Sequence, residues 1–413
     1  MNDTLYTLGC GDRFGRQGKA QLAAYIEAAK QGISVCPVWN KSHREHTTVH
    51  TDPVSVRIEA DEAVQTLGWT NPYFVDADHI SLKNVDGFLD SSDFFTIDVA
   101  DSIGQPAAPK DVDTFTAAMA EHIGEINLPG IDEPLVVSES AIRAIAEKYL
   151  FAVQEAGVIY RHIAAQKEGG FIVEVSMDET DDPQSPVEML FILAMIAREA
   201  IPIDTIAPKF SGRFNKGVNY VGDVAQFEQE FELDVAALRF ASEQFGVKES
   251  LRLSVHSGSD KFAIYPAINR IIKKFNTGLH VKTAGTNWLE EVIGLAEAGG
   301  DGLAVAKKIY AAALTRYDEL AAPYSAVIDI DPEQLPSVDT VNAWSSGDYV
   351  QALRHDPNCP DYNPSFRQLV HVAYKVAFEL GDEYINALEK HADIVGKNVT
   401  HNLLARHIIP IFG

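Results

Sequence analysis

Short apolar, β-branched runs alternate with longer amphipathic stretches through the first three-quarters of the chain. Stretches such as QLAAYIEAAK and VEMLFILAMIAREA have the spacing of helices that bury one face. The apolar runs predict eight strands, at residues 5–10, 33–38, 73–78, 94–98, 171–178, 203–209, 251–257 and 279–283. Alternating strands and helices are typical of a parallel sheet, and eight such units close a (β/α)8 TIM-type barrel. A doubly wound open sheet has the same periodicity and stays open as the alternative.

Two intervals are longer than this repeat requires. Residues 39–72 contain HREHTTVH and little apolar pattern, so we expect a long loop over the barrel mouth. Residues 100–170 contain a Pro-rich stretch at 105–110, a second loop, and a long helix over 140–166. Beyond residue 283 the pattern is helical throughout. We therefore expect a barrel that carries the active site over residues 1–325, and a helical C-terminal extension over 326–413 that caps it.

Composition and charge narrow the class of protein. Of 413 residues, 46% are hydrophobic and 23% charged, which is ordinary for a globular protein. The formal net charge of −25 argues against a nucleic-acid or anionic-membrane partner. The three cysteines, Cys10, Cys36 and Cys359, are odd in number and widely spaced, which favours reduced thiols. Without a secretory signal or a long apolar run, we expect a cytoplasmic protein with no membrane span.

The predicted strands end in unusually polar residues, and in a (β/α)8 barrel those ends carry the chemistry. The relevant blocks are GCGDRFG, VDADH, FIVEVSMDETD, LRLSVHSGSDKF and LHVKTAG. Side chains alternate along a strand, so Glu174 shares a face with Asp178, and His280 shares one with Lys282. Their apolar neighbours belong against the surrounding helices. We therefore expect the polar set, with His256, to point into the barrel.

Buried Glu, His and Lys side chains need partners, because an unpaired buried charge is costly. A divalent metal bound by Glu174, His256 and His280 would satisfy all three. One carboxylate and two imidazoles suit Zn, Mn, Ni, Co or Fe better than Ca or Mg. The alternative is a hydrogen-bonded network in which both histidines contact backbone or carboxylate groups.

Three further motifs are weaker. His43, His46 and His50 have a spacing that superficially suits a metal, but they lie in a polar stretch that favours a surface loop. GCGDRFG nearly matches a dinucleotide fingerprint, yet its third glycine is one residue late and the ribose-binding acid is missing. VKTAGTN could hold a substrate oxyanion or form a plain tight turn.

Seven blocks resemble those of a known family. GDRFG, DADH, EVSMDETDDPQSP, KGVNYVGDVAQFE, HSGSDKFAIYPA, HVKTAGTNWLE and RQLVHVAY occur in the same order in the tagaturonate epimerases. The resemblance, from about Gly11 to Tyr374, implies a metal-dependent (β/α)8 barrel that interconverts D-fructuronate and D-tagaturonate. It implies the same three metal ligands that strand alternation selects. It also implies three acid–base candidates, Asp12, Asp78 and Asp178.

The two keto acids differ at a carbon β to the ketone, whose hydrogen is not acidic, so enolisation alone cannot invert it. Transient oxidation would need a nicotinamide, for which we find no site. Retro-aldol cleavage, rotation of the aldehyde and re-addition would need a Lewis acid and a base. We expect substrate contacts from Arg13, Lys209, Ser257, Lys261 and Lys282, with Gln368 and His371 closing over the site from the cap.

Two other functions stay open on the sequence alone. The same metal site would suit an isomerase, epimerase or aldolase acting on another keto sugar or sugar acid. A sugar-acid sensor without catalysis is the non-enzymatic alternative. The expected partner in every case is a small sugar-acid or keto-sugar molecule. The sequence leaves the identity of the metal and the oligomeric state open.

Overall fold

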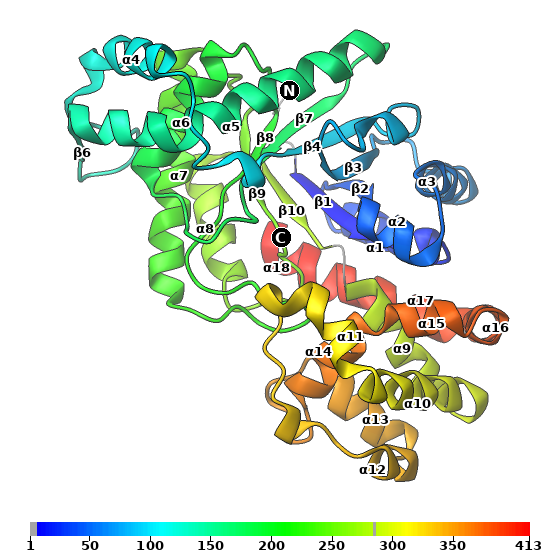
Figure 1. Cartoon of the computed structure of the whole chain (residues 1–413). Helices are drawn as coiled ribbons and strands as arrows, with labels where there is room; N and C mark the ends of the chain where they lie inside the picture. The colour runs from blue at the N-terminus through cyan, green and yellow to red at the C-terminus, as the bar shows by residue number, and fades with distance from the viewer. Residues whose placement is uncertain (1–5, 284–285) are drawn as a thin grey trace.

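The computed structural model describes residues 6–283 and 286–413, and within them eight parallel strands close into a barrel (Figure 1). The strands are β1 (Tyr6–Gly11), β2 (Cys36–Asn40), β3 (Phe74–Ile80), β4 (Phe94–Asp98), β7 (Ile172–Ser176), β8 (Thr205–Ala207), β9 (Arg252–Val255) and β10 (Leu279–Lys282). Around the barrel their order is β1-β10-β9-β8-β7-β4-β3-β2. The closed barrel confirms the predicted fold class and excludes the open sheet. Leu5, the first residue of the first predicted strand, lies outside the described residues.

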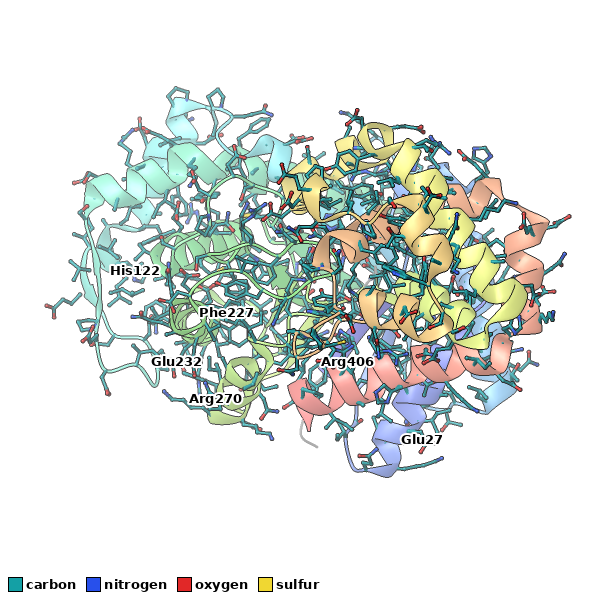
Figure 2. The ribbon with its side chains drawn as sticks, turned by 90° about the horizontal axis from the view of Figure 1, so that it is seen from below. Glu27, His122, Phe227, Glu232, Arg270 and Arg406 are labelled. Carbon is teal, nitrogen blue, oxygen red and sulfur yellow. The ribbon has the colours of Figure 1, made fainter. Side chains whose placement is uncertain are left out.

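Amphipathic helices surround the barrel. They are α1 (Gly18–Lys30), α3 (Val54–Leu67), α5 (Glu139–Gln166), α6 (Pro186–Arg198), α7 (Val224–Phe245), α8 (Tyr265–Phe275) and α9 (Thr286–Ala298). Residues at the N-terminus of α6 favour the start of a helix there. Ser185 and Glu188 form a reciprocal capping box, and Pro186 occupies the first helical position. Neighbouring helices are joined at the surface, where Arg270 of α8 pairs with Glu228 of α7. Figure 2 labels Arg270 at the edge of the molecule.

The long loop expected over residues 39–72 is wrong. This interval forms α2 (His43–Val49) and then α3. Ser42 and Glu45 make a capping box at the start of α2, and His50 ends it in a left-handed conformation with φ of 50°. The prediction failed because a seven-residue helix made mainly of polar residues has too little apolar periodicity to be recognised.

The interval between β4 and β7 was partly predicted. The long helix expected over 140–166 is confirmed as α5. The Pro-rich stretch leads into α4 (Pro109–Ala118), which the sequence reading did not resolve. A small antiparallel hairpin of β5 (Gly124–Ile126) and β6 (Leu135–Val137) follows, outside the barrel.

The chain beyond α9 is helical, as predicted, and Figure 1 shows it as a lobe beside the barrel. Its elements are α10 (Gly300–Thr315), α11 (Tyr317–Ala321), α12 (Val338–Ala343), α13 (Ser346–Leu353), α14 (Pro364–Val372), α15 (Tyr374–Glu379), α16 (Asp382–Lys390), α17 (Ala392–His401), the π-helix η6 (Asn402–Ile408) and α18 (Ile409–Phe412). The last turns return to the barrel, where the Phe412 ring lies 5.0 Å from that of Tyr6. The boundary at residue 325 stays a prediction. Among the described residues no helix is long and apolar enough to span a membrane.

Candidate active site

A bulge near the end of β3 decides which side chains reach the barrel mouth. Strand alternation directs Asp76 and Asp78 inward, and it would direct His79 outward. The register between β3 and β4 shifts between Ala77 and Ile80, and His79 has a left-handed φ of 52°. The bulge therefore turns His79 toward the mouth, where its Nδ1 lies 3.0 Å from Asp98 Oδ2 at the end of β4.

His256, directly after β9, lies between two carboxylates of the β7 segment. Its Nε2 is 2.7 Å from Glu174 Oε1, and its Nδ1 is 3.0 Å from Asp178 Oδ1. Ser176 donates a hydrogen bond of 2.5 Å to the same Asp178 oxygen. The rings of His256 and His79 are 5.1 Å apart. Residues from three separate strands thus meet at one point.

Lys282 at the end of β10 completes the group. Its Nζ lies 2.8 Å from Asp76 Oδ2, 2.7 Å from Asp78 Oδ1 and 3.4 Å from Glu174 Oε1. Thr96 Oγ1 accepts a 2.6 Å hydrogen bond from it. We call the whole set the mouth cluster; it comprises Asp76, Asp78, His79, Asp98, Glu174, Asp178, His256 and Lys282.

The mouth cluster is rich in negative charge. Burial alone would lower the pKa of both histidines, but Asp78 and Asp98 raise the pKa of His79 to about 10. Asp178 and Glu174 likewise raise the pKa of His256 to about 9. Burial favours protonation of Asp178, yet His256 outweighs it and holds the pKa of that carboxyl well below its usual range. The site therefore stabilises added positive charge.

These residues fit a divalent metal better than the trio selected from sequence. Ligand atoms of His79, Asp178 and His256 lie within 4.8 Å of one another. Each histidine has a carboxylate against one ring nitrogen, Asp98 for His79 and Glu174 for His256. This is how metal-binding imidazoles are usually oriented, with the other nitrogen left for the ion. Two imidazoles and a carboxylate suit Zn, Mn, Ni, Co or Fe.

His280, the third residue of the predicted trio, lies deeper in the barrel. It precedes Lys282 by two residues, which places it about 7 Å further down the strand. Its Nδ1 is 2.8 Å from Thr7 Oγ1, and burial lowers its pKa to about 3. Glu174 Oε2 and His280 Nε2 are buried without a hydrogen-bond partner in the described part of the chain. The ligand role of Glu174 and His280 stays a prediction.

Several predicted acid–base and substrate-binding residues lie in structural contacts. Asp12 accepts hydrogen bonds from the backbone N–H groups of residues 14 to 17, and so organises the loop that leads into α1. Arg13 pairs with Glu45 at 3.0 Å and lies over the Tyr374 ring. Lys209 Nζ donates to the Thr180 carbonyl. The Lys261 ammonium donates three hydrogen bonds to backbone carbonyls, which use all of its protons.

Two of the remaining predicted contacts, Gln368 and His371, belong to α14 of the helical lobe. The Gln368 side chain accepts a hydrogen bond from the Asp329 N–H and donates one to the Asp329 carbonyl. It therefore fixes the segment between α11 and α12. His371 is buried beside Gly217, and burial lowers its pKa. Ser257 follows His256 with a left-handed φ of 51°. The VKTAGTN block expected to bind an oxyanion covers residues 281–287, and its residues 284–285 lie outside the described residues.

Lys216 is not among the substrate contacts predicted from sequence, although it lies in the KGVNYVGDVAQFE block of the family resemblance. Burial lowers its pKa, while Glu45, Glu179 and Asp78 act in the opposite direction. Its ammonium forms no hydrogen bond with other residues in the described ranges. His79 lies in the VDADH block at a predicted strand end, but the metal ligands predicted from sequence do not include it.

Comparisons with known proteins match nearly the whole chain. A family model described as tagaturonate epimerase matches residues 1–408. The curated tagaturonate/fructuronate epimerase of Thermotoga maritima is 27% identical over 417 residues, which cover 97% of this chain and 80% of that protein. Two glycerol-complexed crystal structures of the fructuronate-tagaturonate epimerase of Cohnella laeviribosi have TM-scores of 0.81 and 0.82, at 24% and 23% identity. They align over 99% and 100% of this chain, and over 81% and 82% of their own.

Proposed function

Because this chain belongs to the tagaturonate epimerase family, we propose that it interconverts D-fructuronate and D-tagaturonate with a divalent cation at the barrel mouth. The observation that supports the cation is the pairing of both mouth histidines with carboxylates. His79 and His256 would bind it together with Asp178, while Asp98 and Glu174 orient the two rings. When bound, such a cation supplies Lewis acidity toward a ketone oxygen of the substrate.

Asp78 is the base in this proposal. Burial would raise its pKa, but Lys282 at 2.7 Å and His79 outweigh burial and lower it to about 2. The carboxylate is therefore ionised at neutral pH and can accept the proton of the hydroxyl on the carbon that is inverted. Cleavage of the bond between that carbon and the carbon next to the ketone then leaves an aldehyde and an enediolate, which takes the bonding electron pair. Rotation of that aldehyde and re-addition, with the proton returned by Asp78, gives the epimer.

Lys216 binds the substrate carboxylate in this proposal. Its ammonium has no protein hydrogen-bond partner in the described part of the chain, and it lies in the electrostatic range of Asp78. A charge-assisted hydrogen bond to a carboxylate would offset the cost of burying the lysine. Lys209, already bound to the Thr180 carbonyl, is the matched control. Lys216→Met should raise KM far more than Lys209→Met.

The test is to incubate the protein with D-fructuronate, before and after metal stripping, and to resolve the products by chromatography. Tagaturonate formed only with metal present supports both parts of the proposal. Asp78→Asn should then lower kcat by roughly 10²- to 10⁴-fold, the usual contribution of a general base, while metal content stays unchanged. Full activity after chelation would contradict the proposed dependence on a metal. Two three-carbon fragments that never recombine would identify an aldolase instead.

The protein is further proposed to act in the cytoplasm on a small sugar-acid substrate. Cys10, Cys36 and Cys359 are all free, which is the usual state of thiols in a reducing compartment. Fractionation of cells that express the native chain would check this assignment.

A further inference from the structure

One buried amide beside the mouth cluster has no partner in the protein. Asn40 is the last residue of β2, and it is 1% exposed. Neither its Nδ2 nor its Oδ1 forms a hydrogen bond within residues 6–283 and 286–413. Burying an amide without partners costs free energy, because water satisfies the same group in the unfolded chain. Stability of the fold therefore does not explain why this position holds an asparagine.

The backbone of β1 makes room for the Asn40 amide. Gly9 lies inside β1 and pairs with Lys282 of β10. Paired residues on neighbouring strands point to the same side of a sheet, so a side chain at Gly9 would point into the barrel as Lys282 does. A Cβ atom there would lie 2.9 Å from Asn40 Nδ2, which is too close for a carbon–nitrogen contact. Glycine inside a strand commonly marks such a close approach.

The amide thus lies on the inner face of β1, next to residues of the mouth cluster. The same Cβ atom on Gly9 would lie 3.2 Å from Lys282 Cα and 3.5 Å from its Cγ. The Lys282 ammonium lies 2.7 Å from the proposed base, Asp78. On its other side Asn40 pairs with Asp76 of β3, two residues before that base. Asn40 therefore adjoins the groups that would act on the substrate.

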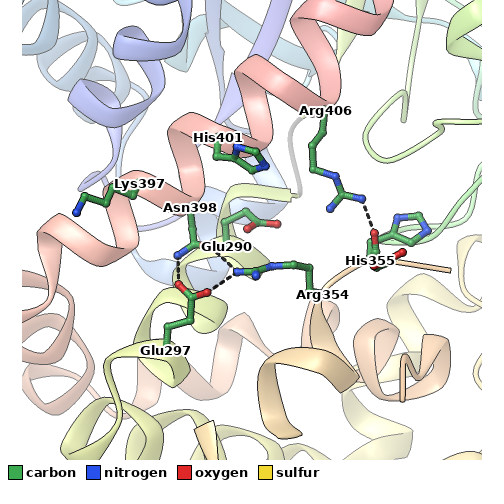
Figure 3. Close-up of a pocket in the computed structure, with 9 residues that line it drawn as sticks. Glu290, Glu297, Arg354, His355, Lys397, Asn398, His401 and Arg406 are labelled. Carbon is green, nitrogen blue, oxygen red and sulfur yellow. Dashed lines mark hydrogen bonds and ion pairs between the residues drawn. The ribbon is translucent and has the colours of Figure 1, made fainter. Parts of the chain in front are cut away.

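An asparagine with a structural role looks different in this protein. Asn398 of α17 lines a pocket outside the barrel and is half-buried. Its Oδ1 accepts a 2.7 Å hydrogen bond from Arg354, and its Nδ2 donates one of 2.6 Å to Glu297 of α9 (Figure 3). Both ends of this amide join helices of the lobe. The amide of Asn40 is more deeply buried and joins nothing.

We propose that Asn40 binds hydroxyl groups of the sugar-acid substrate, with Oδ1 as acceptor and Nδ2 as donor. This inference rests on the proposed function and adds a specificity-determining residue to the same site. A side-chain amide suits hydroxyl groups, because each hydroxyl can both donate and accept a hydrogen bond. A carboxylate in place of Asn40 would only accept, and it would repel Asp76 and Asp78. Sites built to bind a substrate hydroxyl discriminate strongly against analogues that lack it.

Kinetics with D-fructuronate and calorimetric titration of the same compound test this inference on the full chain. Asn40→Leu replaces the amide by an apolar group with the same branching. It should lower kcat/KM by about 10- to 100-fold, mostly through KM, because the contact is made in the bound ground state as well. Affinity for D-fructuronate should fall by a similar factor. The melting temperature should equal or exceed that of the wild type, since a buried amide without partners is removed.

Asn398→Leu is the matched control. It should lower the melting temperature and leave kcat/KM unchanged, because its amide joins helices outside the barrel. Asn40→Ala, which adds no volume, gives the same kinetic readout if Asn40→Leu does not fold. Gly9→Ala should also raise KM, since the new methyl group displaces the Asn40 amide. Combined with Asn40→Ala, it should cost less than the product of the two single losses, because both changes remove one contact.

The outcomes separate this inference from the proposed function. An Asn40→Leu protein with wild-type KM and wild-type affinity would overturn the inference, while leaving the epimerase activity in place. Losses that multiply fully in the double variant would overturn the part assigned to Gly9. A wild-type protein that binds D-fructuronate through Asn40 without converting it would support the inference and contradict the proposed function. Neither binding nor conversion by the wild type would overturn both.

Discussion

Two buried charged clusters each include a residue of the segment after β9, His256 in one and Asp260 in the other, and they differ in charge balance. In the mouth cluster five carboxylates face one lysine and two histidines. The other we call the seam cluster; it joins the barrel to the helical lobe and comprises Asp260, His355, Arg367 and His407. It has one carboxylate and one arginine.

The pKa values of the histidines reflect this difference in charge balance. In the mouth cluster neighbouring carboxylates raise the pKa values of His79 and His256. In the seam cluster burial dominates and lowers the pKa values of His355 and His407, despite Asp260. His407 accepts a hydrogen bond from the Asp260 N–H at Nε2 and contacts the Asn402 carbonyl through Nδ1, the pattern of a neutral ring. The seam cluster balances its own charge, whereas the mouth cluster has more carboxylates than cations, which supports the cation proposed there.

The largest expected effect comes from removing a mouth histidine. His79→Asn should lower metal affinity by roughly 10³-fold or more, because a ligand is lost rather than its orienting partner. Asp98→Asn, which removes only the carboxylate behind His79, should lower it by about 10- to 100-fold. Metal content after dialysis against buffered zinc or manganese measures both.

His280→Asn distinguishes the two ligand sets. With His79, Asp178 and His256 as ligands, this variant keeps its metal, because His280 lies a layer deeper against Thr7. Loss of metal in His280→Asn but not in His79→Asn would instead support the trio of Glu174, His256 and His280. The folded state of each variant is checked by its thermal melting curve.

The seam cluster should respond in stability rather than in metal content. Arg367→Gln leaves the Asp260 carboxylate buried without its cation, at an expected cost of about 3–5 kcal/mol in unfolding free energy. Adding Asp260→Asn should recover part of that loss, since the uncompensated charge is then removed. Urea unfolding measures both. Arg270→Gln is the surface control, and its exposed pair with Glu228 is worth at most about 1 kcal/mol. Equal losses in Arg367→Gln and Arg270→Gln would refute the comparison.

The fold could be predicted from sequence because its signal is periodic. Each of the eight strands begins and ends within a few residues of its predicted range. The polar strand ends also predicted that Glu174, Asp178 and His256 point into the barrel, and the three residues do lie together there. These features depend on alternation along single strands, which a sequence displays directly.

The rest depends on features that alternation does not encode. His79 reaches the mouth through a bulge, which reverses the face that its position predicts. His280 points inward as predicted, but depth along the barrel separates it from His256. The seam cluster joins residues about a hundred positions apart, Asp260 and Arg367, whose pairing exists only once the lobe has packed on the barrel.

Asp234 is a buried carboxylate outside both clusters, and it gives the smallest expected effect in this comparison. Asp234 on α7 is 1% exposed, and its Oδ1 has no hydrogen-bond partner within the described chain. Burial, with a further contribution from Glu230, raises its pKa well above the usual range. The folded state therefore favours the neutral form. The contribution of Asp234 to stability is present in acid, below the ordinary aspartate pKa, and is lost as the pH rises toward the raised value.

Asp234→Asn removes this titration, so the variant should gain stability relative to the wild type as the pH increases from 4 to 7. The gain is at most about 1.4 kcal/mol per pH unit, and urea unfolding at several pH values measures it. Asp132→Asn, at an exposed position, is the control and should show no such trend. A difference between Asp234→Asn and wild type that does not change with pH would mean that Asp234 is ionised in the fold, with a counter-charge. Asp234 would then belong with Asp260, as a balanced pair, rather than standing as the uncompensated case.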